Sequence, residues 1–553
     1  MRPAANGQSY LRERYMRPLY TLLVIVGIVL LVACANIANL LLARATARRH
    51  EVSIRLALGA SRLRLARQLL VESLLLSGAG ALLGLFVAHW GSRLLLGQLT
   101  TSTSSVFLDL RPDWRVLGFT GTVAILTTII FGTVPALRAT RVEPIEALKE
   151  HGRGPEGRGR VGPASTLVGA QVALSLVLII TAGLFVRTFA TLANLHLGFD
   201  RDRVLVVSID TPPGEEAPPD RIGLAGRVRE AVAALPGVAQ AAVSVVTPVS
   251  GSSWQFSIEV PGGASFPEGK NGTYVNLITP GWFATYGTPL LAGRDFDDRD
   301  RAGAKPVAIV NEAFAKKFLN GANPIGWSVR HLGHAKVPPP FEIVGLAADA
   351  VYRSLRAEVP PTMYLALAQR EEQPHSISLS VRAAQESPSL LARPVAAAIA
   401  GIDPKLSLTF RPLADQVRAA LTQERLAAML SGFFGALALL LAGLGLYGVT
   451  SYSVRRRRAE LGIRIALGAA PTGVVRLVMT RLAIVVTIGI GLGILAGWWA
   501  ARFVGALLYG LTARDPMTFA GSVAVLVAVG ALAAWLPARR AARIDPIEVL
   551  REG

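Results

Sequence analysis

Two pairs of opposite charges recur at one spacing in two similar segments of the chain. Glu51 and Arg55 lie in EVSIRLALGA, and Glu460 and Arg464 lie in ELGIRIALGA. A spacing of four places both charges on one helical face, where an ion pair contributes about 0.3 to 0.5 kcal/mol. The other use of such a face is contact with a partner. Because the segment occurs twice, we expect partner docking, with a partner that is itself two-fold.

We call these two segments the docking segments. In each of them, five residues on the charged helical face or at its end are expected to contact the partner. They are Glu51, Ile54, Arg55, Leu58 and Gly59 in the first copy and Glu460, Ile463, Arg464, Leu467 and Gly468 in the second.

A second motif also occurs twice, each time directly after an apolar stretch. It reads PALRATRVEPIEALKE from Pro135 to Glu150 and PARRAARIDPIEVLRE from Pro537 to Glu552. Its equivalent positions include Pro144 and Glu146 in the first copy and Pro546 and Glu548 in the second. The two repeated motifs together predict a duplicated membrane module.

No spacing in the sequence is that of a known catalytic site. The nearest approach to a phosphate-binding loop, ASFPEGKN from Ala264 to Asn271, lacks the first glycine and the hydroxyl that would hold magnesium. Neither GxSxG nor HExxH occurs. His331 and His334 lack the further ligands that zinc requires. We therefore predict no enzyme activity, no cofactor and no metal.

The elements that position these motifs are predicted to be membrane helices. Hydrophobic residues make up 52% of the 553 positions, and the mean hydropathy is +0.44. Seven stretches without a charged residue reach the roughly 20 residues that cross a bilayer. They are Leu19 to Ala43, Ser73 to Ser92, Val116 to Leu137, Val161 to Val186, Leu426 to Val454, Leu482 to Ala501 and Pro516 to Pro537.

The net charge of +20 is explained by where the basic residues lie. Arginine and lysine gather after the first, third, fifth and seventh stretches, which is the positive-inside pattern. It predicts a multi-pass inner-membrane protein with a cytoplasmic C-terminus, and places the N-terminus and the 191–424 domain outside. Nucleic-acid binding is disfavoured by this distribution, and a secondary role for the basic residues is attraction of anionic lipid at the inner leaflet.

The segment between the fourth and fifth stretches has the composition of a soluble α+β domain with two subdomains. Predicted strands are Arg203 to Asp210, Val238 to Val246, Phe256 to Val260, Tyr274 to Ile278, Val307 to Val310, Phe341 to Val344 and Ile377 to Val381; predicted helices are Pro219 to Leu235, Glu312 to Leu319 and Ser389 to Ile402. Asn311 is expected to cap a helix. Arg294 and Asp295 are interpreted as scaffold residues, with a binding role as the alternative.

Polar residues within the predicted spans are few. Asn36 and Asn39 are expected to form hydrogen bonds between helices, each contributing about 1 kcal/mol. Gly489, Gly491, Gly493 and Gly497 are expected to allow close helix contact. The only cysteine, Cys34, lies in the first span, so the outer domain has no disulfide.

These motifs resemble those of the MacB/FtsX-type permeases of ABC transporters. The resemblance rests on the two repeated motifs and on LAGRDF at Leu291 and NEAF at Asn311. It implies that the two docking segments rest on a dimer of ATPase subunits, whose closure is passed through long helices to the outer domain. Within this family the chain is most similar to duplicated permeases, and we expect that it lacks their first span and first periplasmic domain.

The expected fold is a membrane α-helical bundle of about seven helices with one inserted extracytoplasmic α+β domain. The expected parts are an extracytoplasmic lead-in (1–18), a first three-span FtsX-like unit (19–150), a transmembrane helix (151–190), a MacB-type periplasmic core domain (191–424) and a second three-span unit (425–553).

Two functions remain open at the level of sequence. The first is a permease subunit that couples a separate ATPase to the outer domain for export or extraction of a substrate, with a periplasmic adaptor or outer-membrane protein as a further partner. The second is a non-transporting scaffold or signalling module that regulates an extracytoplasmic partner such as a cell-wall hydrolase.

Overall fold

The computed structural model describes two units that are considered separately. Described are residues 10–47, 55, 61–99, 114–115, 117–123, 125–126, 129, 163–211, 220–267, 269–332, 339–374, 376–385, 387–456, 458–467 and 470–543. The membrane unit comprises Met1–Thr100, Val106–Thr191 and Glu424–Gly553, and the α/β unit comprises Thr101–Ser105 and Leu192–Gln423.

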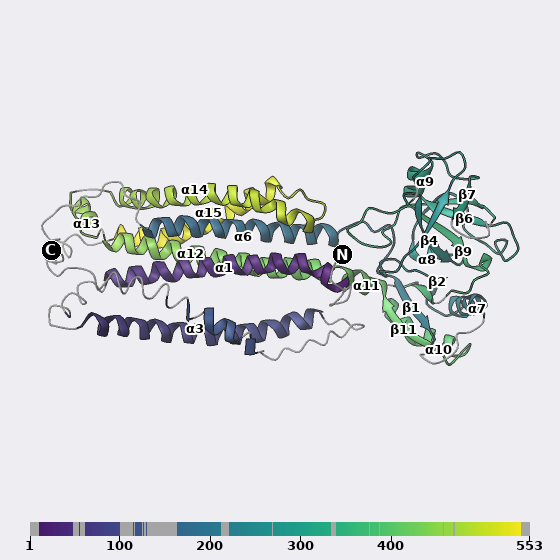
Figure 1. Cartoon of the computed structure of the whole chain (residues 1–553), viewed down its shortest axis with the longest axis horizontal. Helices are drawn as coiled ribbons and strands as arrows, with labels where there is room; N and C mark the ends of the chain where they lie inside the picture. Colours follow the sequence, from purple (N-terminus) through teal and green to yellow (C-terminus); the bar gives the residue numbers. More distant parts are fainter. Residues whose placement is uncertain are drawn as a thin grey trace. The chain divides into compact units, whose positions relative to one another are not determined.

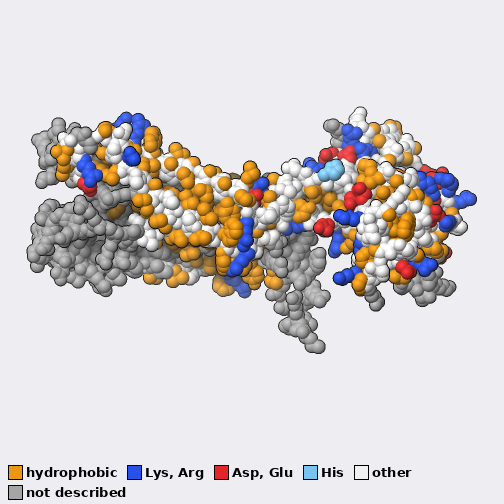
Figure 2. Space-filling view, turned by 90° about the horizontal axis from the view of Figure 1, so that it is seen from above, with side chains coloured by type: hydrophobic (Ala, Val, Ile, Leu, Met, Phe, Trp, Pro, Cys, Tyr) orange, Lys and Arg blue, Asp and Glu red, His pale blue; other side chains and the backbone are white. Residues whose placement is uncertain are grey.

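The membrane unit is built from helices, most of them long (Figure 1). They are α1 (Tyr10–Ala47), α3 (Arg62–Leu99), α6 (Pro163–Ala193), α12 (Thr422–Arg456), α13 (Arg458–Ala466), α14 (Pro471–Val504), the 3-10 turn η4 (Gly505–Leu507) and α15 (Pro516–Ala541). Within the described residues, segments of α1, α6, α12, α14 and α15 are long and apolar enough to cross a membrane. Figure 2 shows the apolar side chains that cover these helices.

The predicted number of seven spans is therefore matched in part. The helix α3 contains the predicted second span, Ser73 to Ser92, but is not among the five helices that meet the criteria for a span. The predicted third span, Val116 to Leu137, falls largely outside the described residues. Five helices among the described residues are therefore candidate spans, and the count of seven stays a prediction.

The core of the membrane unit forms around α6. Val172, Leu176 and Ile180 of α6 are almost fully buried and pack with residues of α12 and α15. Glycines of α14 let it approach α6 closely, since a Cβ at Gly489 would lie 2.8 Å from the carbonyl oxygen of Gly169. Gly493 and Gly497 also face α6. The predicted close contact is thus confirmed at these three glycines and wrong at Gly491, where a Cβ would meet open space.

The α/β unit is organised around hydrogen-bonded strands. They are β1 (Val204–Asp210), β2 (Val238–Ser244), β3 (Trp254–Glu259), β4 (Gly272–Ile278), β5 (Leu290–Gly293), β6 (Val307–Asn311), β7 (Ser328–Leu332), β8 (Phe341–Ala347), β9 (Thr362–Ala366), β10 (Ile377–Ala383) and β11 (Ser407–Pro412). The order is β11-β1-β10-β2-β4-β3-β7-β8-β6-β9, and β5 pairs with β8.

Two halves of this sheet are joined at a single residue pair. The strands β11, β1, β10 and β2 form an antiparallel half, which meets the other half only where Ser244 of β2 pairs with Ile278 of β4. In the second half the path closes on itself, because β9 pairs in parallel with β4. This arrangement agrees with the expected α+β domain of two parts.

Short helices cover the strands and complete two buried clusters. They are α7 (Arg221–Ala233), α8 (Trp282–Tyr286), α9 (Glu312–Phe318), α10 (Ala392–Ala400) and α11 (Leu413–Ala420), with 3-10 turns η2 (Leu367–Gln369) and η3 (Pro388–Leu391). One cluster centres on the aromatic residues of α8, where the rings of Trp282 and Tyr286 lie 4.6 Å apart. The other packs α7, α9 and α10 against strands from both halves.

The seven predicted strands and three predicted helices are all present, with ends shifted by a few residues. Asn311 caps α9 as expected, because its side chain accepts a hydrogen bond of 3.0 Å from the N–H of Phe314. The same oxygen accepts from the N–H of Thr362 at the start of β9. The strands β5, β7, β9 and β11 and the helices α8 and α11 were not predicted.

Candidate functional site

The second docking segment forms a short amphipathic helix, α13. Leu461 of this helix is almost fully buried against Val474 of α14 and Ala541 of α15. Ile465, one turn further on, packs against the same cluster. These contacts fix one face of α13 to the ends of the longer helices.

The opposite face of α13 is exposed. Ile463 is 48% exposed, and Leu467, directly after the last residue of α13, is 83% exposed. Between them the Arg464 guanidinium lies 2.8 Å from the Glu460 carboxylate, and both side chains are about half exposed. We call Glu460, Ile463, Arg464 and Leu467 the docking face. Their spacing of i, i+3, i+4 and i+7 is that of helices that bind in a groove.

Only one residue of the first docking segment is described. Arg55 is helical and exposed, and one of its guanidinium nitrogens lies 3.5 Å from the side-chain oxygen of Gln68. The other predicted positions lie outside the described residues: Glu51, Ile54, Leu58, Gly59, Gly468, Pro144, Glu146, Pro546 and Glu548. The predicted partner contact stays a prediction for both docking segments. Pro144, Glu146, Pro546 and Glu548 belong to the cytoplasmic tail motifs, for which no contact was predicted.

A polar cluster lies where α1, α6 and α12 meet. The side-chain amides of Asn36 and Gln171 both donate to the carbonyl oxygen of Leu441, at 2.8 and 2.7 Å. A Cβ on Gly445 would lie within 3 Å of both amides, so this glycine makes room for them. The expected interhelical hydrogen bond is thus present at Asn36.

Asn39 does not make the expected bond. It is buried, and neither atom of its amide has a hydrogen-bond partner among the described residues. Gln171 takes the role that the sequence analysis gave to Asn39. The signal for it was available, because Gln171 is a lone amide within an otherwise apolar stretch.

An ion pair that the sequence analysis missed joins the C-terminal end of α6 to the start of α15. Arg187 pairs with Asp515. Asp515 is also the N-cap of α15, where it accepts hydrogen bonds from the backbone N–H and hydroxyl of Thr518 at 2.8 and 2.5 Å. The Asp515 carboxylate therefore bonds to Arg187 and Thr518, which both belong to the membrane unit.

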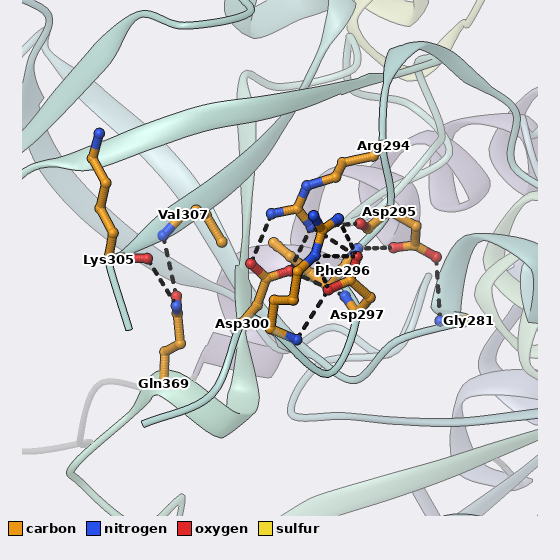
Figure 3. A network of polar contacts seen from close by, with 10 residues as sticks. Gly281, Arg294, Asp295, Phe296, Asp297, Asp300, Lys305, Val307 and Gln369 are labelled. Atoms are coloured by element: carbon orange, nitrogen blue, oxygen red, sulfur yellow. Dashed lines mark hydrogen bonds and ion pairs between the residues drawn. The ribbon is translucent and has the colours of Figure 1, made fainter. Parts of the chain in front are cut away.

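In the α/β unit, Arg294 and Asp295 lie in a network of polar contacts (Figure 3). The guanidinium of Arg294 donates to both oxygens of the buried Asp300 carboxylate, at 2.7 and 2.8 Å. Asp295 accepts from the N–H groups of Phe296 and of Gly281, at 2.7 and 3.2 Å, and so holds the turn before α8. These contacts favour the scaffold interpretation.

The pKa values of two carboxylates in this network, Asp295 and Asp300, are shifted in opposite directions. Burial raises the pKa of Asp295, against the opposing effect of its two backbone donors. Burial alone would also raise the pKa of Asp300, but the hydrogen bonds from Arg294 and from the backbone N–H of Asp297 outweigh it and the net shift is downward. The Asp300 carboxylate is therefore held in its charged form by the loop itself.

His331 lies in the core instead of in a metal site. It is buried, and its ring stacks on that of Phe256 with the centroids 4.1 Å apart. His334 lies outside the described residues. Within the part of the chain that is described, no three His, Cys, Asp or Glu side chains gather as metal ligands.

Comparison with family models divides the chain into two membrane segments and a domain between them, as the structure does, although the domain model begins within α6. A model described as FtsX-like permease C-terminal matches residues 23–144 and again residues 432–546. A model described as MacB-like periplasmic core domain matches residues 166–398.

Curated relatives match parts of the chain. The pyoverdine export ATP-binding/permease protein PvdT of Pseudomonas entomophila is 31% identical over 49% of this chain and 41% of its own length. The uncharacterized ABC transporter permease YknZ of Bacillus subtilis is 25% identical over 52% of this chain and 72% of its own length. The chain thus spans less than half the length of PvdT.

Among solved structures, the periplasmic region of MacB from Actinobacillus actinomycetemcomitans covers 39% of this chain and 92% of its own length, at 13% identity and a TM-score of 0.28. The identification rests on the family models, which match both membrane segments and the domain between them. The chain belongs to the MacB/FtsX-type family of ABC transporter permeases, multi-pass membrane proteins with an inserted periplasmic core domain.

Proposed function

We propose that the chain is a permease subunit that couples a separate cytoplasmic ATPase to its periplasmic core domain. The observation that carries the proposal is the docking face of α13. Its back is fixed to α14 and α15 through Leu461, while Ile463 and Leu467 lie exposed beside the Glu460–Arg464 pair. A partner that pushed on this face would move the ends of the membrane helices.

Leu467 exposes most of its side chain. Burying an aliphatic side chain of this size against a partner is favourable by about 1.5 to 3 kcal/mol. The exposed ion pair contributes little to the stability of α13 itself. Both properties favour a partner over a purely structural role for these residues.

The family supports the nature of the partner. PvdT is named an ATP-binding/permease protein, and its name assigns it to pyoverdine export. By analogy we propose that work from ATP hydrolysis reaches this chain through the docking face and drives export or extraction of a substrate. The docking face then lies in the cytoplasm and the α/β unit outside.

Photo-crosslinking from the docking face tests the partner. The full chain carries p-benzoylphenylalanine at position 463, and the control carries it at the buried position 461. We expect crosslinking to an ABC ATPase, identified by mass spectrometry, from position 463 and not from position 461. Absence of an ATPase at position 463, or equal crosslinking from both positions, rejects the proposal.

A charge exchange separates docking from simple ion pairing. R464E breaks the pair, and E460K/R464E restores an ion pair with its charges reversed. If the residues contact the ATPase, both variants lose coupled ATP hydrolysis when co-expressed with it. If the pair only stabilises α13, the double variant recovers the activity, which contradicts docking through these two side chains.

Crosslinking from the α/β unit separates transport from regulation. Leu390 is 74% exposed in this unit and is a suitable position for the same probe. An adaptor or outer-membrane protein captured there supports export, and a cell-wall hydrolase supports the regulatory alternative.

A further inference from the structure

Aromatic side chains gather with two arginines at the end of α14. Trp498, Trp499 and Phe503 are exposed by 49, 58 and 61%. They end a helix of 34 residues that is apolar enough to cross a membrane. Arg502 lies among them on α14, and Arg514 lies just before α15. We call these five residues the α14-end cluster.

Both arginines in the cluster stack on aromatic rings. The guanidinium carbon of Arg502 lies 4.5 Å from the ring centroid of Trp499 and 4.9 Å from that of Phe503. The guanidinium carbon of Arg514 lies 4.3 Å from the centroid of Trp498. Because Trp498 and Trp499 are consecutive, two separate chain segments bring their positive charges to neighbouring rings.

The two positive charges have no acidic partner among the described residues. The carboxylate next to Arg514 in sequence belongs to Asp515, which is already engaged by Arg187 and Thr518. Arg502 and Arg514 are both exposed. A guanidinium stacked on a ring keeps its N–H groups free in the plane, where they can donate in pairs to phosphate oxygens.

We propose that the α14-end cluster binds the headgroup phosphate of an anionic phospholipid. The arginines supply the donors and the charge, and the exposed rings lie beside the glycerol backbone and the first carbons of the acyl chains. A soluble anion would explain the arginines but not the exposed rings. Aromatic residues at the end of a membrane helix are placed at the headgroup level, where such a lipid is available.

The alternative is an aromatic belt that anchors the helix end and has no preference for any lipid headgroup. The other end of α15 offers a comparison, since Arg539 lies 5.1 Å from the ring centroid of Trp535 while the neighbouring Arg540 donates to the hydroxyl of Tyr447. At that end Arg539 stacks on a ring, and its neighbour Arg540 is engaged by a tyrosine hydroxyl. Selectivity for a negative headgroup therefore distinguishes the α14-end cluster from ordinary anchoring.

The test is retention of phospholipid by the purified full chain in mild detergent, measured by native mass spectrometry with equal amounts of phosphatidylglycerol and phosphatidylcholine added. We expect the chain to retain phosphatidylglycerol in preference. R502Q/R514Q should bind it more weakly by about fivefold for each arginine removed. The variant R227Q/R330Q, which removes two exposed arginines of the α/β unit, should behave as the unaltered chain.

Three results would overturn the proposal. They are equal retention of the two lipids by the unaltered chain, unchanged preference in R502Q/R514Q, and an equal loss in R227Q/R330Q. A further arm adds inorganic phosphate to the lipid-free chain, and binding of this ion as tight as that of the lipid would show that no lipid is required. The first measurement needs no variant and does not depend on ATPase coupling, so its failure leaves the proposed function untouched.

Discussion

Two arginine–carboxylate pairs in this protein have similar distances and opposite surroundings. In the α/β unit, Arg294 makes two hydrogen bonds to Asp300, whose side chain is 4% exposed and also accepts from the N–H of Asp297. On α13, Arg464 makes one contact of 2.8 Å with Glu460, and both side chains are about half exposed. The first pair is closed by its own loop, whereas the second is open to a partner. Surroundings, and not pair geometry, distinguish the scaffold pair from the pair that we propose contacts a partner.

The largest expected effect comes from breaking the closed pair. D300A leaves Arg294 without its main acceptor and should lower the free energy of unfolding of the α/β unit by about 2 to 3 kcal/mol, since Arg294 remains partly solvated. Pulse proteolysis of the full chain in urea measures this. The neighbouring exposed residue supplies the control, D298A, and an equal loss in both variants would show that the network is not a stabilising scaffold.

A smaller effect is expected in the membrane unit. N36L removes a bond to the carbonyl of Leu441, which still accepts from Gln171, so the loss should be about 1 kcal/mol. N39L removes an amide that has no partner among the described residues and should be neutral or stabilising. Thermal unfolding in detergent compares the two. A loss in N39L as large as that in N36L would mean that Asn39 has a partner after all.

The closed pair also predicts a dependence on pH. Because the folded state lowers the pKa of Asp300, its contribution to stability is complete above the unfolded value of about 3.9 and is lost as pH falls through the lower folded value. D300N lacks this contribution and should show a shallower loss of stability in acid. The unfolding midpoint in urea, measured at a series of pH values, checks this, and parallel curves would contradict it.

The smallest effect on stability is expected at the open pair. R464Q should change the free energy of unfolding by less than about 0.5 kcal/mol, because a half-exposed ion pair within one helix contributes little. The same variant should reduce coupled ATP hydrolysis, as the proposed function requires. A large loss of stability would instead assign the pair to the scaffold and remove the contrast with Arg294 and Asp300.

The sequence was most informative where the pattern is local. Long runs of apolar residues located the membrane helices, and short apolar runs rich in β-branched residues located seven strands. The strand β5 was missed since it has only four residues. All five residues of β9 are buried, but so are those of the predicted strand β6, so burial does not explain why β9 was missed. The helix α8 was not predicted because Pro280 and Gly281, which precede it, are residues typical of a turn.

Contacts between distant segments could not be predicted in the same way. Arg187 and Asp515 are 328 positions apart, and only the packing of α6 beside α15 brings them together. The role of Gln171 was missed for a related reason. Residue type shows that an amide in a span needs a partner, but only the facing helix decides which amide finds one.

Cysteine labelling tests the central claim most directly, since that claim requires the docking face and the α/β unit to lie on opposite sides of the membrane. The only native cysteine, Cys34, is buried in α1, so L467C and L390C each introduce one accessible thiol into the full chain. In spheroplasts treated with a membrane-impermeant maleimide, we predict that L390C reacts at once and that L467C reacts only after permeabilisation. Equal reaction of L467C in intact spheroplasts would contradict the account.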